Sequence, residues 1–156
     1  MKYFLDETHK NSVMKVIRDK RLVYPDGQGD CYYLPALFIL LSTKNDLYKK
    51  TRNYITEDGI DFAMMMEKQD FSSGEAKLVR LAANLFNGSM EVTPQEFINS
   101  LDDKNYDLAM QAICFRRYGC HIENLLDREM GMDMEVSAER DIRTDIAMKN
   151  DFQMEL

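Results

Sequence analysis

The sequence contains little of what metal sites, redox centres and disulfide-stabilised scaffolds require. Its 156 residues include no tryptophan, two histidines and three cysteines, at positions 31, 114 and 120. The cysteines are odd in number and lack the CxxC spacing of zinc sites, so we expect reduced thiols. Only Cys120 and His121 are adjacent, and neighbouring side chains point apart, which leaves tetrahedral ligation incomplete. We therefore expect neither a metal nor a cofactor.

Long apolar runs are also missing. The longest uninterrupted run extends from Ala36 to Leu41, far below the roughly 20 residues that a membrane-spanning helix needs. The N-terminal residues MKYFLDETHK lack the apolar core of a secretory signal. We expect a soluble, cytoplasmic protein that makes no membrane contact. An apolar content of 45% is enough to close one hydrophobic core, so a single compact domain is the default.

Positive charge is scarce in the last quarter of the chain. The net charge is −7, from 27 acidic and 20 basic residues. Residues 1–118 carry 17 acids and 16 bases, or −1, whereas residues 119–156 carry 10 acids and 4 bases, or −6. Broad phosphate binding needs clustered lysine and arginine, so this balance argues against direct nucleic-acid binding.

Helix-start and helix-stop signals recur along the chain. The clearest helix lies between a capping box at Ser72 and Glu75 and a left-handed stop at Asn87 and Gly88. Further helix starts are predicted near Asp6 or Thr8, near Leu34 or Pro35, at Thr93, and near Asp102 or Asp103. No pair of segments carries a hairpin signal.

These signals predict an all-α fold, a compact single-domain bundle of about six to eight short helices. The helical core is expected over residues 1–118 and an acidic, methionine-rich helical extension over residues 119–156. Helical spacing predicts the residues that each short helix buries. These are Phe97, Ile98 and Leu101 after Thr93, and Tyr106, Ala109, Met110 and Ile113 after Asp102.

Cys31 raises the question of nucleophilic catalysis, because the stretch GQGDCYYLPALFILL places it ahead of a buried helix. A cysteine nucleophile is commonly activated at a helix N-terminus with histidine as base, and His121 is the better candidate here. Pro35 opposes this hypothesis. A helix that began at Asp30 would place the proline at its fifth position, where it removes a hydrogen bond and clashes with the carbonyl of Cys31. A later start leaves the thiol outside the helix dipole. A hydrolase that uses Cys31 and His121 is therefore the alternative prediction.

Three blocks of sequence carry a resemblance to a known family. They are FLDETH, DCYYLPALFILLSTKNDLY, and LVRLAANLFNG followed by SLDDKNYDLAMQAICFRR. Together they resemble an uncharacterised family of small proteins from Gram-positive bacteria and their phages, domain of unknown function 6075. The match covers residues 3 to 117 and consists mostly of core and capping positions. Cys31, Cys120 and His121 fall outside the family's pattern, so the resemblance assigns the thiol no catalytic role.

The matching blocks also contain three polar residues, His9, Asp30 and Tyr32. They are candidates for a polar cluster near the turn that precedes the central helix. A cleft for binding or acid–base chemistry is one interpretation, and a hydrogen-bonded structural cluster is the one that we favour. For His9 itself, capping or packing is favoured over a role as base or ligand.

The acidic extension holds five of the twelve methionines. Adaptable thioethers among carboxylates are typical of surfaces that mould themselves to a partner. Packing of the extension on its own core and docking onto another chain, including a second copy in a homodimer, both stay open. The leading prediction is a non-enzymatic protein-interaction module that modulates, for example inhibits, a bacterial host protein with a basic or nucleic-acid-binding surface. The predicted binding residues are Met130, Met132, Met134, Glu135, Ile142 and Ile146.

Overall fold

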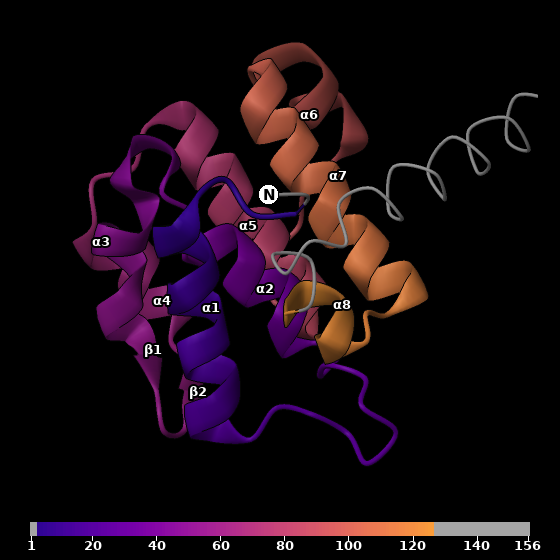
Figure 1. Cartoon of the computed structure of the whole chain (residues 1–156). Coiled ribbons are helices and arrows are strands. Elements are labelled where there is room, and N and C mark those ends of the chain that lie inside the picture. Colours follow the sequence, from indigo (N-terminus) through magenta and orange to yellow (C-terminus); the bar gives the residue numbers. More distant parts are fainter. Residues whose placement is uncertain (1–2, 127–156) are drawn as a thin grey trace, which may run out of the picture.

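The computed structural model describes residues 3–126, apart from the side chain of Asn45. These residues form eight α-helices, two 3₁₀ turns and one two-stranded hairpin (Figure 1). The predicted all-α fold is confirmed. Within this range, no helix is both long and apolar enough to cross a membrane. The elements are α1 (Glu7–Lys20), α2 (Tyr33–Leu40), η1 (Lys44–Asp46), α3 (Leu47–Thr51), η2 (Arg52–Tyr54), β1 (Ile55–Thr56), β2 (Gly59–Ile60), α4 (Phe62–Lys68), α5 (Ser73–Asn87), α6 (Pro94–Ser100), α7 (Asp103–Tyr118) and α8 (Ile122–Leu126).

Helix α2 forms the centre of the molecule. Every residue from Leu34 to Leu40 is buried, and the helix packs against α1, α5 and α7 (Figure 1). A helix that is apolar on all sides has no solvated face, so it is stable only when neighbours surround it. Fully burying each large aliphatic or aromatic side chain contributes about 1.5–3 kcal/mol before the entropic cost of folding. The run ALFILL therefore organises the core.

Two polar side chains cap the buried C-terminal end of α2. The last carbonyl groups of a helix lack partners within it and are costly to bury unsatisfied. His9 Nε2 lies 2.7 Å from the carbonyl oxygen of Phe38, and the Thr51 hydroxyl donates to the carbonyl oxygen of Leu40. Both His9 and Thr51 are fully buried. The favoured structural role of His9, as a packing residue, agrees with these contacts.

The predicted helix caps are present. Asp6 accepts from the backbone N–H of His9 at the start of α1, and Ser72 and Glu75 form a reciprocal capping box at α5. Gly88 ends α5 in the left-handed conformation, with φ of 69°. Thr93 and Asp102 precede α6 and α7 as predicted. Local sequence therefore sets where these helices begin and end.

The predicted buried face of α7 is wrong in part. Tyr106 is exposed and Met110 and Ile113 are only half-buried, although Ala109 is buried. The face that enters the core consists of Asn105, Leu108, Ala109, Ala112 and Phe115. Apolar residues cover most of the circumference of α7, so periodicity alone did not select the buried side. On α6, Ile98 is 68% exposed while Phe97 is buried.

One further expectation differs from the structure. The absence of a hairpin is corrected by β1 and β2, which pair antiparallel with Ile55 opposite Ile60 and Thr56 opposite Gly59. Gly59 has φ of 140°, which favours glycine at the end of the tight turn. The central helix ends at Leu40, and residues 44–54 form η1, α3 and η2.

Residues 119–126 pack on the bundle. Cys120, Ile122 and Leu125 are buried members of the hydrophobic core. Residues 119–126 thus pack with the core, and a separate acidic extension stays a prediction for the residues that follow α8. The predicted binding residues Met130, Met132, Met134, Glu135, Ile142 and Ile146 lie outside the described residues.

Candidate functional site

The loop between α1 and α2 is tied to the end of α7. Gly29 donates its backbone N–H to the carbonyl of Cys120 at 2.9 Å, and Ile122 donates to the carbonyl of Gly27 at 2.9 Å. The His121 ring lies directly on Gly27, whose φ is 87°. A methyl group at that glycine would be 2.2 Å from His121 Nε2. Only glycine fits both the backbone conformation and this close approach.

Asp30 caps the turn that leads into α2. One carboxylate oxygen accepts from the N–H groups of Tyr32 and Tyr33, both at 2.9 Å, and the backbone carbonyl of Asp30 accepts from Leu34. Cys31 lies inside this capped turn, before Tyr32 and before the start of regular helix at Tyr33, which is close to the predicted start near Leu34 or Pro35. Pro35 is tolerated because regular helix begins only at Tyr33, so the proline is the third helical residue.

The Cys31 sulfur has a phenol as its partner. Its Sγ lies 3.7 Å from the Tyr24 hydroxyl, and the hydrogen bond with Cys31 raises the pKa of Tyr24 above its ordinary value. His121 Nδ1 instead accepts from the backbone N–H of Glu123 at 3.3 Å. Among residues 3–126, no imidazole nitrogen contacts the sulfur. The backbone N–H groups of Tyr32 and Tyr33, which follow Cys31, already donate to the Asp30 carboxylate. The structure therefore does not assemble the Cys31–His121 pair of the hydrolase alternative.

The other predicted cluster is not assembled either. The His9 ring packs between Phe4 and Phe38, with ring centroids 5.2 and 4.9 Å away, and its Nδ1 accepts from the backbone N–H of Leu5. Asp30 and Tyr32 lie at the opposite end of α2, a helix of eight residues, or about 12 Å. Because α1 and α2 run antiparallel (Figure 1), His9 and the turn at Asp30 lie at opposite ends of this pair.

An exposed surface of tyrosines and arginine lies where Asp30 and Tyr32 meet α7. The Arg116 guanidinium stacks over the Tyr32 ring at 4.6 Å from its centroid, and Tyr32 is 47% exposed. Tyr24, 39% exposed, joins this surface through its contact with Cys31. We call these residues, Tyr24, Cys31, Tyr32 and Arg116, the tyrosine–arginine surface. The contact between Arg116 and Tyr32 spans 84 residues of sequence, beyond the reach of local patterns.

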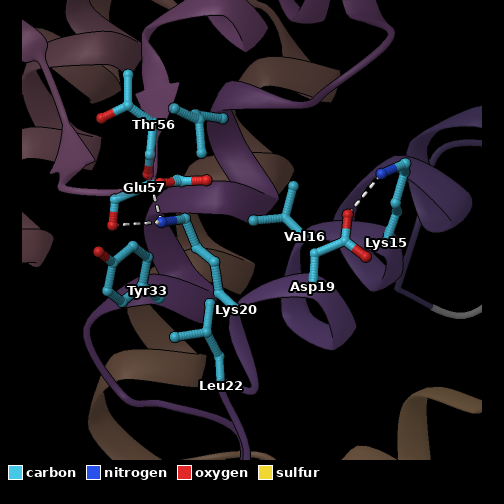
Figure 2. Close-up of a pocket in the computed structure, with 9 residues that line it drawn as sticks. Lys15, Val16, Asp19, Lys20, Leu22, Tyr33, Thr56 and Glu57 are labelled. Atoms are coloured by element: carbon cyan, nitrogen blue, oxygen red, sulfur yellow. Dashed lines mark hydrogen bonds and ion pairs between the residues drawn. The ribbon is translucent and has the colours of Figure 1, made fainter.

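A groove with a volume of about 690 Å³ lies between α1 and the hairpin. Figure 2 shows Lys15 turned toward Asp19, and Lys20 turned toward the backbone of Thr56 and Glu57. Lys20 donates to the backbone carbonyl oxygens of Thr56 and Glu57 and lies 5.6 Å from the Tyr33 ring centroid, and Lys15 pairs with Asp19. Lys20 thus tethers the hairpin to α1, and the groove presents no convergent set of unpaired charges.

A second groove, of about 500 Å³, opens beside the tyrosine–arginine surface. It runs along the last turns of α7 and the start of α8, and carboxamides, aromatic rings, cysteines and the His121 ring line it. Cys114 is exposed and Cys120 is buried, and neither forms a disulfide within the described residues. Within residues 3–126, no three His, Cys, Asp or Glu side chains are grouped so that they could hold a metal ion. We call this cavity the carboxamide groove.

A protein-family model, described as a family of unknown function (DUF6075), matches residues 1–129. The chain belongs to DUF6075. The match includes α8 as well as the blocks that carry the sequence resemblance, so the tyrosine–arginine surface and the carboxamide groove both lie within the family domain. No curated protein and no solved structure matches the chain. The membership of DUF6075 therefore defines the domain but not its activity.

Proposed function

We propose that this DUF6075 protein is a non-enzymatic binding module that modulates a protein of its bacterial host, in the cytoplasm of a Gram-positive cell or during phage infection. Binding uses the tyrosine–arginine surface together with the acidic residues after α8. The stacking of the half-buried Arg116 guanidinium on the exposed Tyr32 ring is the observation that carries this proposal. Tyrosine and arginine are enriched among the residues that dominate binding energy at protein interfaces.

The geometry of this surface suits binding. Arg116 is held over the Tyr32 ring, so its planar donors are oriented before a partner arrives. The backbone of Tyr32 is held in place, because its N–H donates to the Asp30 carboxylate. Side chains that are already ordered lose less conformational entropy when they bind. The surface therefore presents an aromatic face and a guanidinium in a fixed relation.

The sequence after α8 supplies the second part of the proposal. Residues 127–156 carry nine acids and four bases, or −5. Such a segment accelerates encounter with a basic surface, including one that ordinarily receives nucleic acid. The methionines at positions 130, 132 and 134 can adapt to the partner's apolar groups.

Site-specific photo-crosslinking in the native host tests the proposal. The full-length chain carries a benzophenone amino acid at Tyr24 or Tyr32, with Ile98 as the matched control because it is exposed and lies on α6. We expect one host protein to crosslink from both tyrosine positions and not from Ile98. Arg116→Ala should reduce the yield about tenfold or more, whereas Arg18→Ala, at an exposed position on α1, should leave it unchanged.

The acidic residues are tested separately. A chain that ends at residue 126 keeps Ile122 and Leu125 in the core, and its circular dichroism spectrum and melting temperature show whether it folds. If it folds, the crosslink from Tyr32 should weaken, and more so at low salt. Equal yields from Tyr32 and Ile98, or insensitivity to Arg116→Ala, would contradict the assignment of the surface.

One observation favours the alternative, a cysteine-dependent hydrolase. Cys31 is half-buried inside a capped turn at the N-terminal end of α2, with a hydroxyl 3.7 Å from its sulfur. If Cys31 is a nucleophile, an activated-acyl probe should modify it at neutral pH faster than it modifies free cysteine. Cys114, which is exposed, provides an internal comparison. A rate no higher than that of free cysteine removes the hydrolase from consideration.

A further inference from the structure

The carboxamide groove has a lining that fits a peptide segment. Gln28, Gln111 and Asn124 supply carboxamides that can both donate and accept hydrogen bonds, which is what a peptide backbone requires. Phe115 and Tyr118 supply aromatic rings, and Tyr118 is 79% exposed. No lysine, arginine, aspartate or glutamate lines the groove. An uncharged, aromatic lining of this kind favours apolar side chains over ions.

The chain itself continues from the edge of this groove. Asn124, in α8, lines the groove, and α8 ends at Leu126, which is 46% exposed. Met130 follows four residues later and Met134 eight residues later, so they can lie at most about 14 and 28 Å from Leu126. A tether this short gives an effective concentration in the millimolar range, so weak contacts are enough for binding.

The side chains of this segment match the groove. Methionine sulfur makes favourable contacts with aromatic rings, and residues 130–135, MGMDME, contain three methionines. Asp133 and Glu135 alternate with them. The exposed Arg117 guanidinium lies 5.9 Å from the ring centroid of Tyr118, which lines the groove, and it supplies the opposite charge.

We propose that residues 130–135 of the same chain bind in the carboxamide groove, with methionine side chains against Tyr118 and carboxylates toward Arg117. The proposed contact stands on the groove, the reach and the charges, and it does not require that the proposed partner exists.

Methyl NMR of the full-length chain, with ¹³C-labelled methionine methyl groups, tests the contact. Methionine-to-leucine substitutions assign the signals of Met130, Met132 and Met134. We expect at least one of them to be shifted by the aromatic ring current. Tyr118→Ala should return it to the position of a free methionine, and Tyr118→Phe should retain the shift. Tyr106→Ala is the matched control, because Tyr106 is an exposed tyrosine on the same helix outside the groove.

Three further outcomes of this experiment test the proposed contact. Raised salt should reduce the ring-current shift, because the proposed contact between the carboxylates and Arg117 is one between exposed charges. A shift that disappears on dilution assigns the occupant to a second copy of the chain and overturns the intrachain contact. Three free methionine signals in the unmodified protein, unaffected by Tyr118→Ala, overturn the site itself. Because the readout uses no host protein, its failure leaves the crosslinking test at Tyr32 intact.

Discussion

His9→Gln should remove most of the loss of stability that the protein shows on mild acidification. The His9 imidazole is fully buried, and one of its nitrogens accepts a hydrogen bond while the other donates one. Nδ1 accepts from the backbone N–H of Leu5, so Nε2 carries the proton that it donates to the carbonyl of Phe38. A second proton on Nδ1 would break the first bond and place a charge in the core. Glutamine can still donate to the Phe38 carbonyl but does not titrate.

The magnitude follows from the difference in proton binding between the folded and unfolded states. Burial lowers the pKa of His9 from 6.5 to about 4. Between these values the unfolded chain binds a proton that the folded chain does not, so stability is full above the unfolded pKa and falls as the pH falls toward the folded pKa. Linkage gives a loss of about 2 kcal/mol between pH 7 and pH 5 for this residue.

Urea unfolding at pH 7 and pH 5 measures this loss. We expect His9→Gln to be less stable than the unmodified protein at pH 7 by about 1–3 kcal/mol, because it loses the Leu5 bond and the ring contacts. Its stability should nevertheless change less with pH. His121→Gln is the matched control, since His121 is the other histidine of the chain and its side chain is 32% exposed. If His9→Gln loses as much stability as the unmodified protein between the two pH values, the claim that a buried neutral His9 causes the loss is refuted.

Three further substitutions test the packing by thermal or urea unfolding. Thr51→Val leaves a buried carbonyl of α2 without its donor and should cost about 1–3 kcal/mol; a cost near zero would contradict the capping role. Gly27→Ala should lower the free energy of unfolding more than Gly88→Ala does, because both glycines have positive φ but only a methyl group at Gly27 would clash with the His121 ring. Gly88→Ala should cost about 1 kcal/mol. His121→Ala should restore part of the stability that Gly27→Ala loses. Asn105→Leu should be neutral or stabilising by up to about 1 kcal/mol, because its buried Oδ1 has no hydrogen-bond partner among the described residues; a large loss would show that this amide is needed.

The helix ends could be predicted from the sequence because capping is local chemistry. Asp6, Ser72 and Asp102 each accept from the backbone N–H three residues later, and the backbone N–H of Thr93 donates to the Glu96 carboxylate, so a short window of sequence contains both partners. The start of the central helix is local in the same way, because regular helix begins at Tyr33, next to the predicted start near Leu34 or Pro35, after a turn that Asp30 caps.

The candidate site could not be predicted in the same way. The stacking of Arg116 on Tyr32, the contact between Tyr24 and Cys31, and the strand-like bridge between Gln28 and His121 depend on how α7 and α8 return to the first loop. Long-range contacts of this kind leave no spacing in the sequence. The binding residues predicted at 130–146 lie outside the described residues and stay predictions.

The side-chain donors at the C-terminal end of α2 fix the register of the whole bundle. His9 comes from the segment before α2 and Thr51 from the segment after it, and each meets a different carbonyl. Sliding α2 by one turn would break both bonds at once, which opposes any shift of this helix against its neighbours. Amide hydrogen exchange should therefore be slow around Phe38. Because the turn capped by Asp30 leads directly into this helix, the exposed Tyr32 on the turn keeps one position relative to the core.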